Sequence, residues 1–177
     1  MGARRLIPLA AAALVAAAVT GCQDGGPPAE LTATDLAVVA RVNDGDTITL
    51  RGGAKVRLLQ IDAPELTNDC YGLAAKSALE RHVHSGTQVQ LVRDPGLDQT
   101  DRYGRLLRYV VASGENVNVV LVREGAASPY FFRNDRGIYA RQLLEAVEEA
   151  RDARRGYWSA CPGARLNTGV GSVTGPR

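Results

Sequence analysis

The sequence predicts an α+β fold, a five-stranded OB-fold β-barrel with three packed α-helices. Three observations lead to this expectation. Five short runs rich in β-branched residues are separated by turn-forming residues, and helical periodicity occurs only after the third run and again after the fifth. Their order, three strands, a helix, two strands and two helices, fits a barrel with helices against its surface. About 130 residues remain once the two ends are set aside, which suits one domain with one core.

The expected strands are read from β-branched and apolar runs that end at glycine or charged residues. They occupy residues 36–42, 46–51, 55–61, 88–93 and 106–112. Gly52 and Gly53 separate the second run from the third, and a two-residue glycine turn favours a hairpin. The second and third strands are therefore expected to pair with each other.

The three expected helices cover residues 72–83, 117–124 and 137–155. The first has an apolar face at helical spacing, formed by Ala75, Ala78, Leu79 and Val83. The last has a similar buried stripe, formed by Ala140, Leu143, Leu144, Val147 and Ala150. Gly125 and Gly156 follow the second and third helices, and glycine is the usual residue after a helix end.

Residues 1–21 have the pattern of a signal peptide, because Arg4 and Arg5 precede a short apolar run. The run ends in the letters VTGC, which resemble a bacterial lipobox with Cys22 as the lipid-modified residue. A lipid on Cys22 would hold an exported protein at the outer face of the cell membrane. An ordinary cleaved signal is the alternative, and partial release from the surface stays open. Residues 22–35 are interpreted as a tether, 36–161 as the domain and 162–177 as a disordered tail.

Three cysteines are present, and a lipidated Cys22 leaves Cys70 and Cys161 as one pair in an oxidising compartment. A disulfide between them is expected; two free buried thiols are the alternative. Zinc is not indicated, since His82 and His84 are two residues apart on an expected helix with no cysteine near in sequence. Without residues 1–21 the chain has 19 basic and 19 acidic side chains, so net charge neither indicates nor excludes a nucleic-acid partner.

Four carboxylates follow two of the expected strands in two clusters. Asp44 and Asp46 lie in the letters NDGDT, and Asp62 and Glu65 lie in IDAPE. If the two strands are neighbours, four negative charges converge, which favours a bound cation. Oxygen ligands without histidine or thiolate indicate calcium or magnesium. A solvated turn is the alternative for the Asp44-Gly45 step, because aspartate and glycine are common in turns.

Two arginines accompany these acids. Arg57 lies among the apolar residues of the third expected strand, and Arg105 ends the letters TDRYGR. An unpaired guanidinium is costly to bury, so Arg57 needs a partner. A salt bridge to one of the acids is one interpretation; contact of its planar fork with a metal-bound phosphate is the other.

Three motifs, VNDGDT (42–47), VRLLQIDAPE (56–65) and TDRYGR (100–105), resemble the signature blocks of the staphylococcal nuclease family, in the same order. The letters LVREG (121–125) and GYWS (156–159) resemble later landmarks of that family, so the similarity covers about residues 38–159. The resemblance implies a calcium-dependent phosphodiesterase that cuts DNA and RNA on the 5′-oxygen side and leaves 3′-phosphates.

The resemblance also implies a role for each site residue. Asp46, Asp62 and the backbone carbonyl of Ala63 would bind Ca²⁺ directly, and Asp44 would act through water around the ion. Glu65 matches the proposed general base, and Arg57 and Arg105 match the two arginines that stabilise charge on the phosphate. The family's type protein has threonine where this chain has Ala63, a change that leaves the carbonyl ligand in place.

Aromatic side chains suggest contacts with unpaired bases, because rings stack on bases. Tyr103, Tyr130 and Phe132 are the candidates, with a core position as the alternative for Phe131 and Phe132. The expected partners are therefore DNA and RNA with unpaired regions favoured, and a monomer is the default. The competing interpretations are a non-catalytic nucleic-acid-binding surface lipoprotein and an adhesive or ligand-binding surface lipoprotein.

Overall fold

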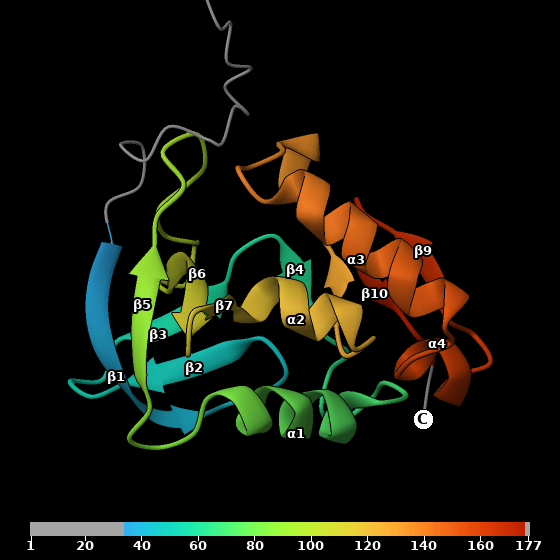
Figure 1. Cartoon of the computed structure of the whole chain (residues 1–177), viewed down its shortest axis with the longest axis horizontal. Coiled ribbons are helices and arrows are strands. Elements are labelled where there is room, and N and C mark those ends of the chain that lie inside the picture. Colours follow the sequence, from blue (N-terminus) through green and yellow to red (C-terminus); the bar gives the residue numbers. More distant parts are fainter. Residues whose placement is uncertain (1–33, 176–177) are drawn as a thin grey trace, which may run out of the picture.

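Five strands close into a barrel within residues 34–175, the part of the chain that this computed structural model describes. Their order is β3-β2-β1-β5-β6, and parallel pairing of β3 with β6 closes the ring (Figure 1). The strands are β1 (Thr34–Val42), β2 (Thr47–Leu50), β3 (Lys55–Leu58), β5 (Gln88–Val92) and β6 (Leu106–Ala112). The predicted five-stranded barrel is confirmed, including the antiparallel hairpin of β2 and β3.

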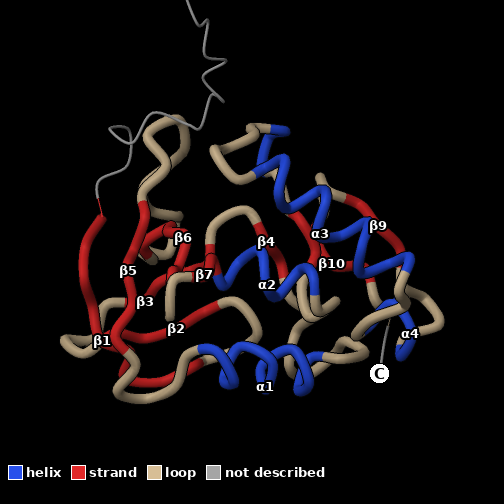
Figure 2. Tube along the Cα trace, in the orientation of Figure 1, coloured by secondary structure: helices blue, strands red, loops and turns tan. Residues whose placement is uncertain are grey.

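Three helices accompany the barrel, α1 (Gly72–His82), α2 (Val117–Arg123) and α3 (Ala140–Asp152). The first two pack on barrel strands, and α3 packs on α2 and on the short strand β8 (Ser128–Pro129). α1 contacts β1 and α2, whereas α2 contacts both β6 and α3. Figure 2 shows the result, a strand-rich side and a helical side with α2 between them. The apolar faces predicted for α1 and α3 point into a core whose fully buried members include Val39, Ile48, Leu58, Leu79, Leu121 and Leu143. Burial of each such side chain stabilises the fold by roughly 1.5–3 kcal/mol.

The last helix is shorter than predicted, because α3 begins at Ala140 and ends at Asp152. Two main-chain N–H groups before it donate hydrogen bonds to side chains and not to helix carbonyls. The N–H of Gly137 donates to Gln60 Oε1 at 3.0 Å, and that of Ile138 donates to Asp94 Oδ2 at 2.8 Å. A 3₁₀ turn (Phe132–Asn134) precedes α3, and a four-residue helix, α4 (Tyr157–Ala160), follows Gly156.

The predicted strand 55–61 is wrong at its end, because the chain turns after β3. Gln60 has a φ of 59°, a left-handed conformation that breaks the ladder. Two hydrogen bonds of its side chain offset the energetic cost of this conformation: Oε1 accepts from Tyr109 Oη at 3.0 Å, and Nε2 donates to the Asp135 carbonyl at 2.7 Å. The following residues form a separate strand, β4 (Ile61–Asp62), paired with β8 (Ser128–Pro129). The turn therefore takes Asp62 out of the barrel ladder.

The predicted boundary at residue 36 is two residues late, because β1 starts at Thr34 and pairs with β5 from there. The predicted signal peptide, the lipidation of Cys22 and most of the 22–35 tether lie outside the described residues and stay predictions. Within residues 34–175, every helix is too short or too polar to cross a membrane.

The predicted disorder of the 162–177 tail is wrong for the residues that the structure describes. The chain there forms a hairpin of β9 (Arg165–Asn167) and β10 (Gly171–Val173). Its loop accepts a hydrogen bond from the Phe131 N–H to the Thr168 carbonyl at 2.7 Å, and Leu166 packs against the main core. These partners are distant in sequence, so the Gly-rich composition alone gave no sign of order.

Cys70 and Cys161 form a disulfide, with their Cα atoms 5.9 Å apart. The bridge links residues separated by 91 positions, so it restricts a long loop in the unfolded chain. Reduction should therefore lower the free energy of unfolding, by up to about 4–5 kcal/mol in the chain-entropy model. Melting curves with and without reductant check this, with thiol titration to prove that the bridge has opened. An unchanged melting temperature with both thiols titrated would contradict it.

Candidate active site

All seven residues predicted to bind metal or act in catalysis line one pocket of about 160 Å³ at the edge of the barrel. The turn between β1 and β2, the β3 strand, the β4 strand with its following loop, and the segment before β6 each contribute. The seven are Asp44, Asp46, Arg57, Asp62, Ala63, Glu65 and Arg105, and Gly45 and Pro64 complete the lining. The fold thus brings together motifs that are separated by up to about 60 positions in the sequence.

The turn between β1 and β2 fits closely against the loop after β4. A Cβ at Gly45 would lie 2.6 Å from the Ala63 Cβ, so only glycine fits at position 45. Asp44 Oδ1 accepts from the Asp46 N–H at 3.1 Å, and Asp46 Oδ2 accepts from the Ala63 N–H at 2.8 Å. Asp46 is therefore buried and fixed in position, at 7% exposure.

Arg57 bridges two of the acids. Its Nη2 lies 3.0 Å from Asp46 Oδ2 and 2.8 Å from Asp62 Oδ1. Its Nη1 donates to the main-chain carbonyls of Leu58 and Ile61 at 2.8 and 2.7 Å. The salt bridge considered as one interpretation of Arg57 is therefore present, and it involves two carboxylates.

Asp46 has an unusual electrostatic environment. The pKa of its carboxyl is raised to about 7, chiefly by burial and also by the neighbouring Asp44 and Asp62, although Arg57 and the Ala63 N–H act to lower it. Such a carboxyl is stabilised by a proton or by additional positive charge. The pocket is therefore suited to a cation.

The donor atoms fit a hard ion such as calcium. Asp46, Asp62 and the Ala63 carbonyl supply oxygen only, the ligand type that calcium and magnesium prefer. Residues 34–175 hold no group of three or more His, Cys, Asp or Glu side chains arranged as a metal site. The predicted set needs only two carboxylates and one main-chain carbonyl, so water would complete the coordination.

Arg105 is held by a partner that the sequence reading did not assign. Asp101 accepts from Arg105 Nε at 2.6 Å and from its main-chain N–H at 3.0 Å. Burial raises the pKa of Asp101, but the hydrogen bonds from Arg105 outweigh it and the pKa lies below its usual value. Arg105 Nη1 lies 3.5 Å from Thr47 Oγ1 in β2. The Arg105 guanidinium therefore faces the pocket while its Nε is held by Asp101. The signal for this partner is in the sequence, because Asp101 lies four residues before Arg105 in the same motif.

Glu65 is exposed, and its main chain is fixed from two directions. The Glu65 N–H donates to Asp69 Oδ2 at 2.9 Å. A Cβ at Gly72 would lie 2.2 Å from the Glu65 carbonyl oxygen, so only glycine allows α1 to begin here. The Glu65 carboxylate thus extends into solvent at the pocket from a rigid loop.

The candidate stacking residues lie at the surface outside the pocket lining. Tyr103 is 67% exposed, with the guanidinium carbons of Arg102 and Arg105 at 4.7 and 5.5 Å from its ring. Tyr130 is half-buried, and Phe132 is 54% exposed. Phe131 is 1% exposed, so of the two phenylalanines it is the one with the core position.

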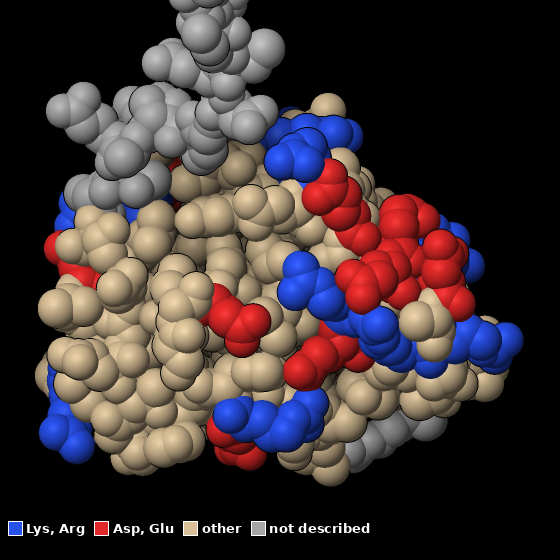
Figure 3. Space-filling view, in the orientation of Figure 1, with Lys and Arg blue, Asp and Glu red and all other residues tan. Residues whose placement is uncertain are grey.

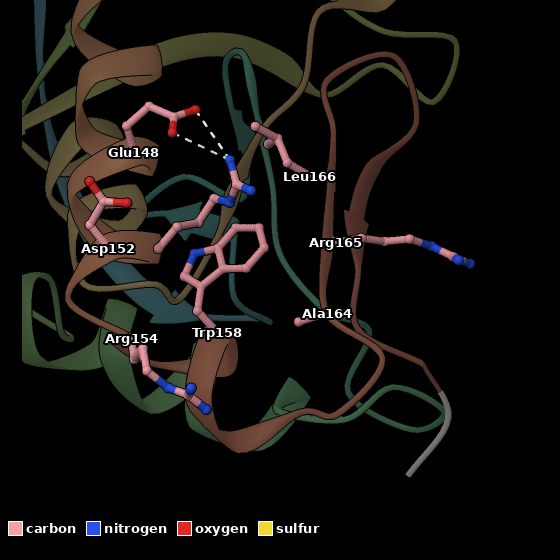
Figure 4. A pocket seen from close by; sticks show the side chains of 8 residues that line it. Glu148, Asp152, Arg154, Trp158, Ala164, Arg165 and Leu166 are labelled. Carbon is pink, nitrogen blue, oxygen red and sulfur yellow. Dashed lines mark hydrogen bonds and ion pairs between the residues drawn. The ribbon is translucent and has the colours of Figure 1, made fainter.

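A larger hollow of about 700 Å³ lies between α3, α4 and β9 and contains none of the predicted site residues (Figure 4). Arg151 lines it with its guanidinium carbon 5.7 Å from the centre of the Trp158 ring, and it pairs with both carboxyl oxygens of Glu148 at 3.3 Å. Figure 3 shows that charges of both signs gather over α3. The lining of the hollow also mixes both signs, with Glu148 and Asp152 next to Arg151 and Arg154, so it offers no continuous positive surface for a phosphate chain.

Comparisons with known proteins identify the family of the chain. The family model "Staphylococcal nuclease homologue" matches residues 55–160, more than half of the chain. The SPbeta prophage-derived endonuclease YokF and the endonuclease YncB, both of Bacillus subtilis (strain 168), are 38% and 37% identical over 127 residues. Those matches cover 67% of this chain but only 42% and 59% of the two relatives. The thermonuclease of Staphylococcus intermedius is 32% identical over 149 residues, 76% of this chain and 85% of that protein. The chain therefore belongs to the staphylococcal nuclease family.

Proposed function

We propose that this protein is a calcium-dependent phosphodiesterase that hydrolyses DNA and RNA on the 5′-oxygen side and leaves 3′-phosphates. The observation that carries the proposal is the convergence of two anchored arginines, three aspartates and an exposed glutamate in one pocket. A protein that only binds nucleic acid has no need for this combination. Relatives named as endonucleases and a thermonuclease support the same conclusion.

In this proposal the carboxylates of Asp46 and Asp62 and the carbonyl of Ala63 hold the ion, and Asp44 acts through water. Calcium, when bound, supplies positive charge that polarises a phosphate oxygen. The Asp46 carboxylate is already oriented without substrate, because it accepts from the Ala63 N–H and because Gly45 packs closely on Ala63. Preorganised groups of this kind need little rearrangement during the reaction.

Glu65 takes a proton from a water molecule, whose oxygen then forms a bond to phosphorus as the bond to the 5′-oxygen breaks. Arg105 donates hydrogen bonds to phosphate oxygens, which gain negative charge in the crowded transition state. Both groups then favour that state over the ground state, which is the source of the rate enhancement. The displaced 5′-oxygen leaves as an oxyanion and takes a proton from solvent to become a hydroxyl, and Glu65 returns its proton to solvent.

Arg57 has two tasks in this proposal. Its Nη2 pairs with the same two carboxylates that would hold the ion. Binding of the ion would replace the charge of Nη2 there and free the guanidinium for the phosphate. An Arg57→Met variant should therefore lose most of its turnover yet bind calcium at least as tightly as the wild type, as measured by calorimetry. A variant with much weaker calcium binding would contradict the replacement.

The substrate range is expected to be broad, because the pocket addresses phosphates rather than base edges. Tyr103 offers an exposed ring next to Arg105, where an unpaired base could stack. Single strands and unpaired regions should therefore be cut faster than duplex.

The test is hydrolysis of heat-denatured and duplex DNA by the purified chain with calcium, with calcium plus chelator, and with magnesium alone. We expect cleavage with calcium, faster on denatured DNA, with 3′-phosphate ends that a phosphatase can remove. Tight binding without cleavage under all three conditions would instead identify a non-catalytic nucleic-acid-binding module. Equal rates on both substrates would contradict the preference for unpaired strands.

A further inference from the structure

We propose that Ser172, on β10 in the C-terminal hairpin, is a positioning residue for Asp62, so that the hairpin forms part of the active site. The inference rests on the proposed calcium site. The main-chain N–H and the Oγ of Ser172 both donate to Asp62 Oδ2, each at 2.9 Å. The other carboxylate oxygen, Oδ1, faces Arg57. Asp62 thus has one oxygen held by the hairpin and one directed to the pocket.

The contact between the hairpin and Asp62 leaves no spare room. A Cβ at Gly171 would lie 2.5 Å from Asp62 Oδ2 and 2.7 Å from the Asp62 Cβ. Gly171 also has a φ of +103°, a conformation that favours glycine. Glycine at this position therefore allows β10 to approach β4 closely enough for Ser172 to donate twice.

The hairpin is held in place independently of Asp62. The disulfide from Cys70 to Cys161 fixes the chain before β9, and the Cys70 N–H donates to the Gly175 carbonyl at 3.0 Å after β10. The Thr168 carbonyl accepts from Phe131 between the two strands. β10 contacts both β4 and β8, and β9 also contacts β8. Ser172 is therefore a preorganised donor, whose place is set by the body of the protein.

The chemistry of these two donors suits a metal ligand. Both are uncharged, so they orient the carboxylate and satisfy one oxygen without adding a positive charge that would compete with the ion. Removal of a residue that orients a metal ligand typically lowers metal affinity or activity by about 10–100-fold. The Ser172 Oγ is one of two donors, so its loss should lie near the lower end, about tenfold in calcium dissociation constant.

The test uses three variants of the full chain and one control variant in calorimetric titrations with calcium, with turnover on denatured DNA as a second readout. Ser172→Ala should raise the calcium dissociation constant about tenfold, and its turnover should return toward wild type at saturating calcium. Ser172→Thr keeps the hydroxyl and should stay near wild type. Gly171→Ala, whose Cβ would meet Asp62, should weaken calcium binding more than Ser172→Ala does. Ser77→Ala, an exposed serine on α1, is the matched control.

The outcomes separate the two proposals. Wild-type calcium affinity in both Ser172→Ala and Gly171→Ala would overturn the positioning role and leave the calcium-dependent activity standing. A wild-type protein that binds no calcium would overturn the proposed function and this inference together. Thermal melting and thiol titration show whether each variant keeps its fold and its disulfide. Weakened calcium binding in a variant that melts like the wild type supports the positioning role, because a merely structural role would lower the melting temperature instead.

Discussion

A Glu65→Gln variant should retain the fold and lose about 10²–10⁴-fold in turnover, the range typical of a general base. The amide has nearly the same shape as the carboxylate but cannot accept a proton from water at neutral pH. Glu65 is exposed, and its main chain is held by Asp69 and by the close approach of Gly72, so the substitution disturbs none of these contacts. The loss should therefore appear in the chemical step and not in stability.

Turnover on heat-denatured DNA at saturating calcium measures this effect, with melting temperature recorded for the same sample. Glu115→Gln is the matched control, because Glu115 is exposed on β7 (Glu115–Asn116), outside the pocket. The control should cut like the wild type. Near-normal turnover in Glu65→Gln would remove Glu65 from the mechanism and leave water activation to another group.

An Arg105→Lys variant should lose about 10²–10³-fold in turnover, the effect of removing one group that stabilises transition-state charge. The guanidinium is anchored through Nε to Asp101 and presents its remaining N–H groups to the pocket. A lysine ammonium is a single point of charge, so it cannot contact Asp101 and a phosphate with the same geometry. Because lysine keeps the positive charge, the loss of turnover would measure the contribution of the planar guanidinium geometry.

Steady-state kinetics distinguish the expected effect from weaker binding. A fall in kcat with a nearly constant KM indicates an interaction made mainly in the transition state. Arg51→Lys, at an exposed position in the turn after β2, is the control for the general effect of exchanging arginine for lysine. If Arg105→Lys raised KM alone, Arg105 would be a binding residue without a special role in the chemical step.

The barrel could be predicted from the sequence because its determinants are local. Alternating runs such as the one in β5 and helical spacing such as that of Ala75 and Leu79 encode which face is buried. The errors lie where distant groups decide the backbone. The left-handed turn at Gln60 and the late start of α3 both depend on hydrogen bonds that join Gln60 to residues 135 and 137. Local periodicity contains no information about such bonds.

The same distinction applies to the site. Acids and arginines in three short motifs could be identified as site candidates, and the fold brings them into one pocket. Asp101 was within reach of sequence reasoning, since it lies four residues before Arg105 in one of these motifs. Ser172 was not, because it contacts Asp62 across 110 positions from a segment whose composition resembles a disordered tail. This contact uses a main-chain N–H and one serine hydroxyl, so it produces no recognisable sequence motif.

The central claim, that the Asp46 and Asp62 carboxylates hold the calcium on which cleavage depends, is tested most directly by one paired titration. Calcium binding by calorimetry and cleavage of denatured DNA are measured over the same calcium concentrations, for wild type and Asp46→Asn. We predict that binding and cleavage rise together in the wild type and that Asp46→Asn loses both. Cleavage that persists in chelator, or wild-type calcium binding by Asp46→Asn, would contradict the account.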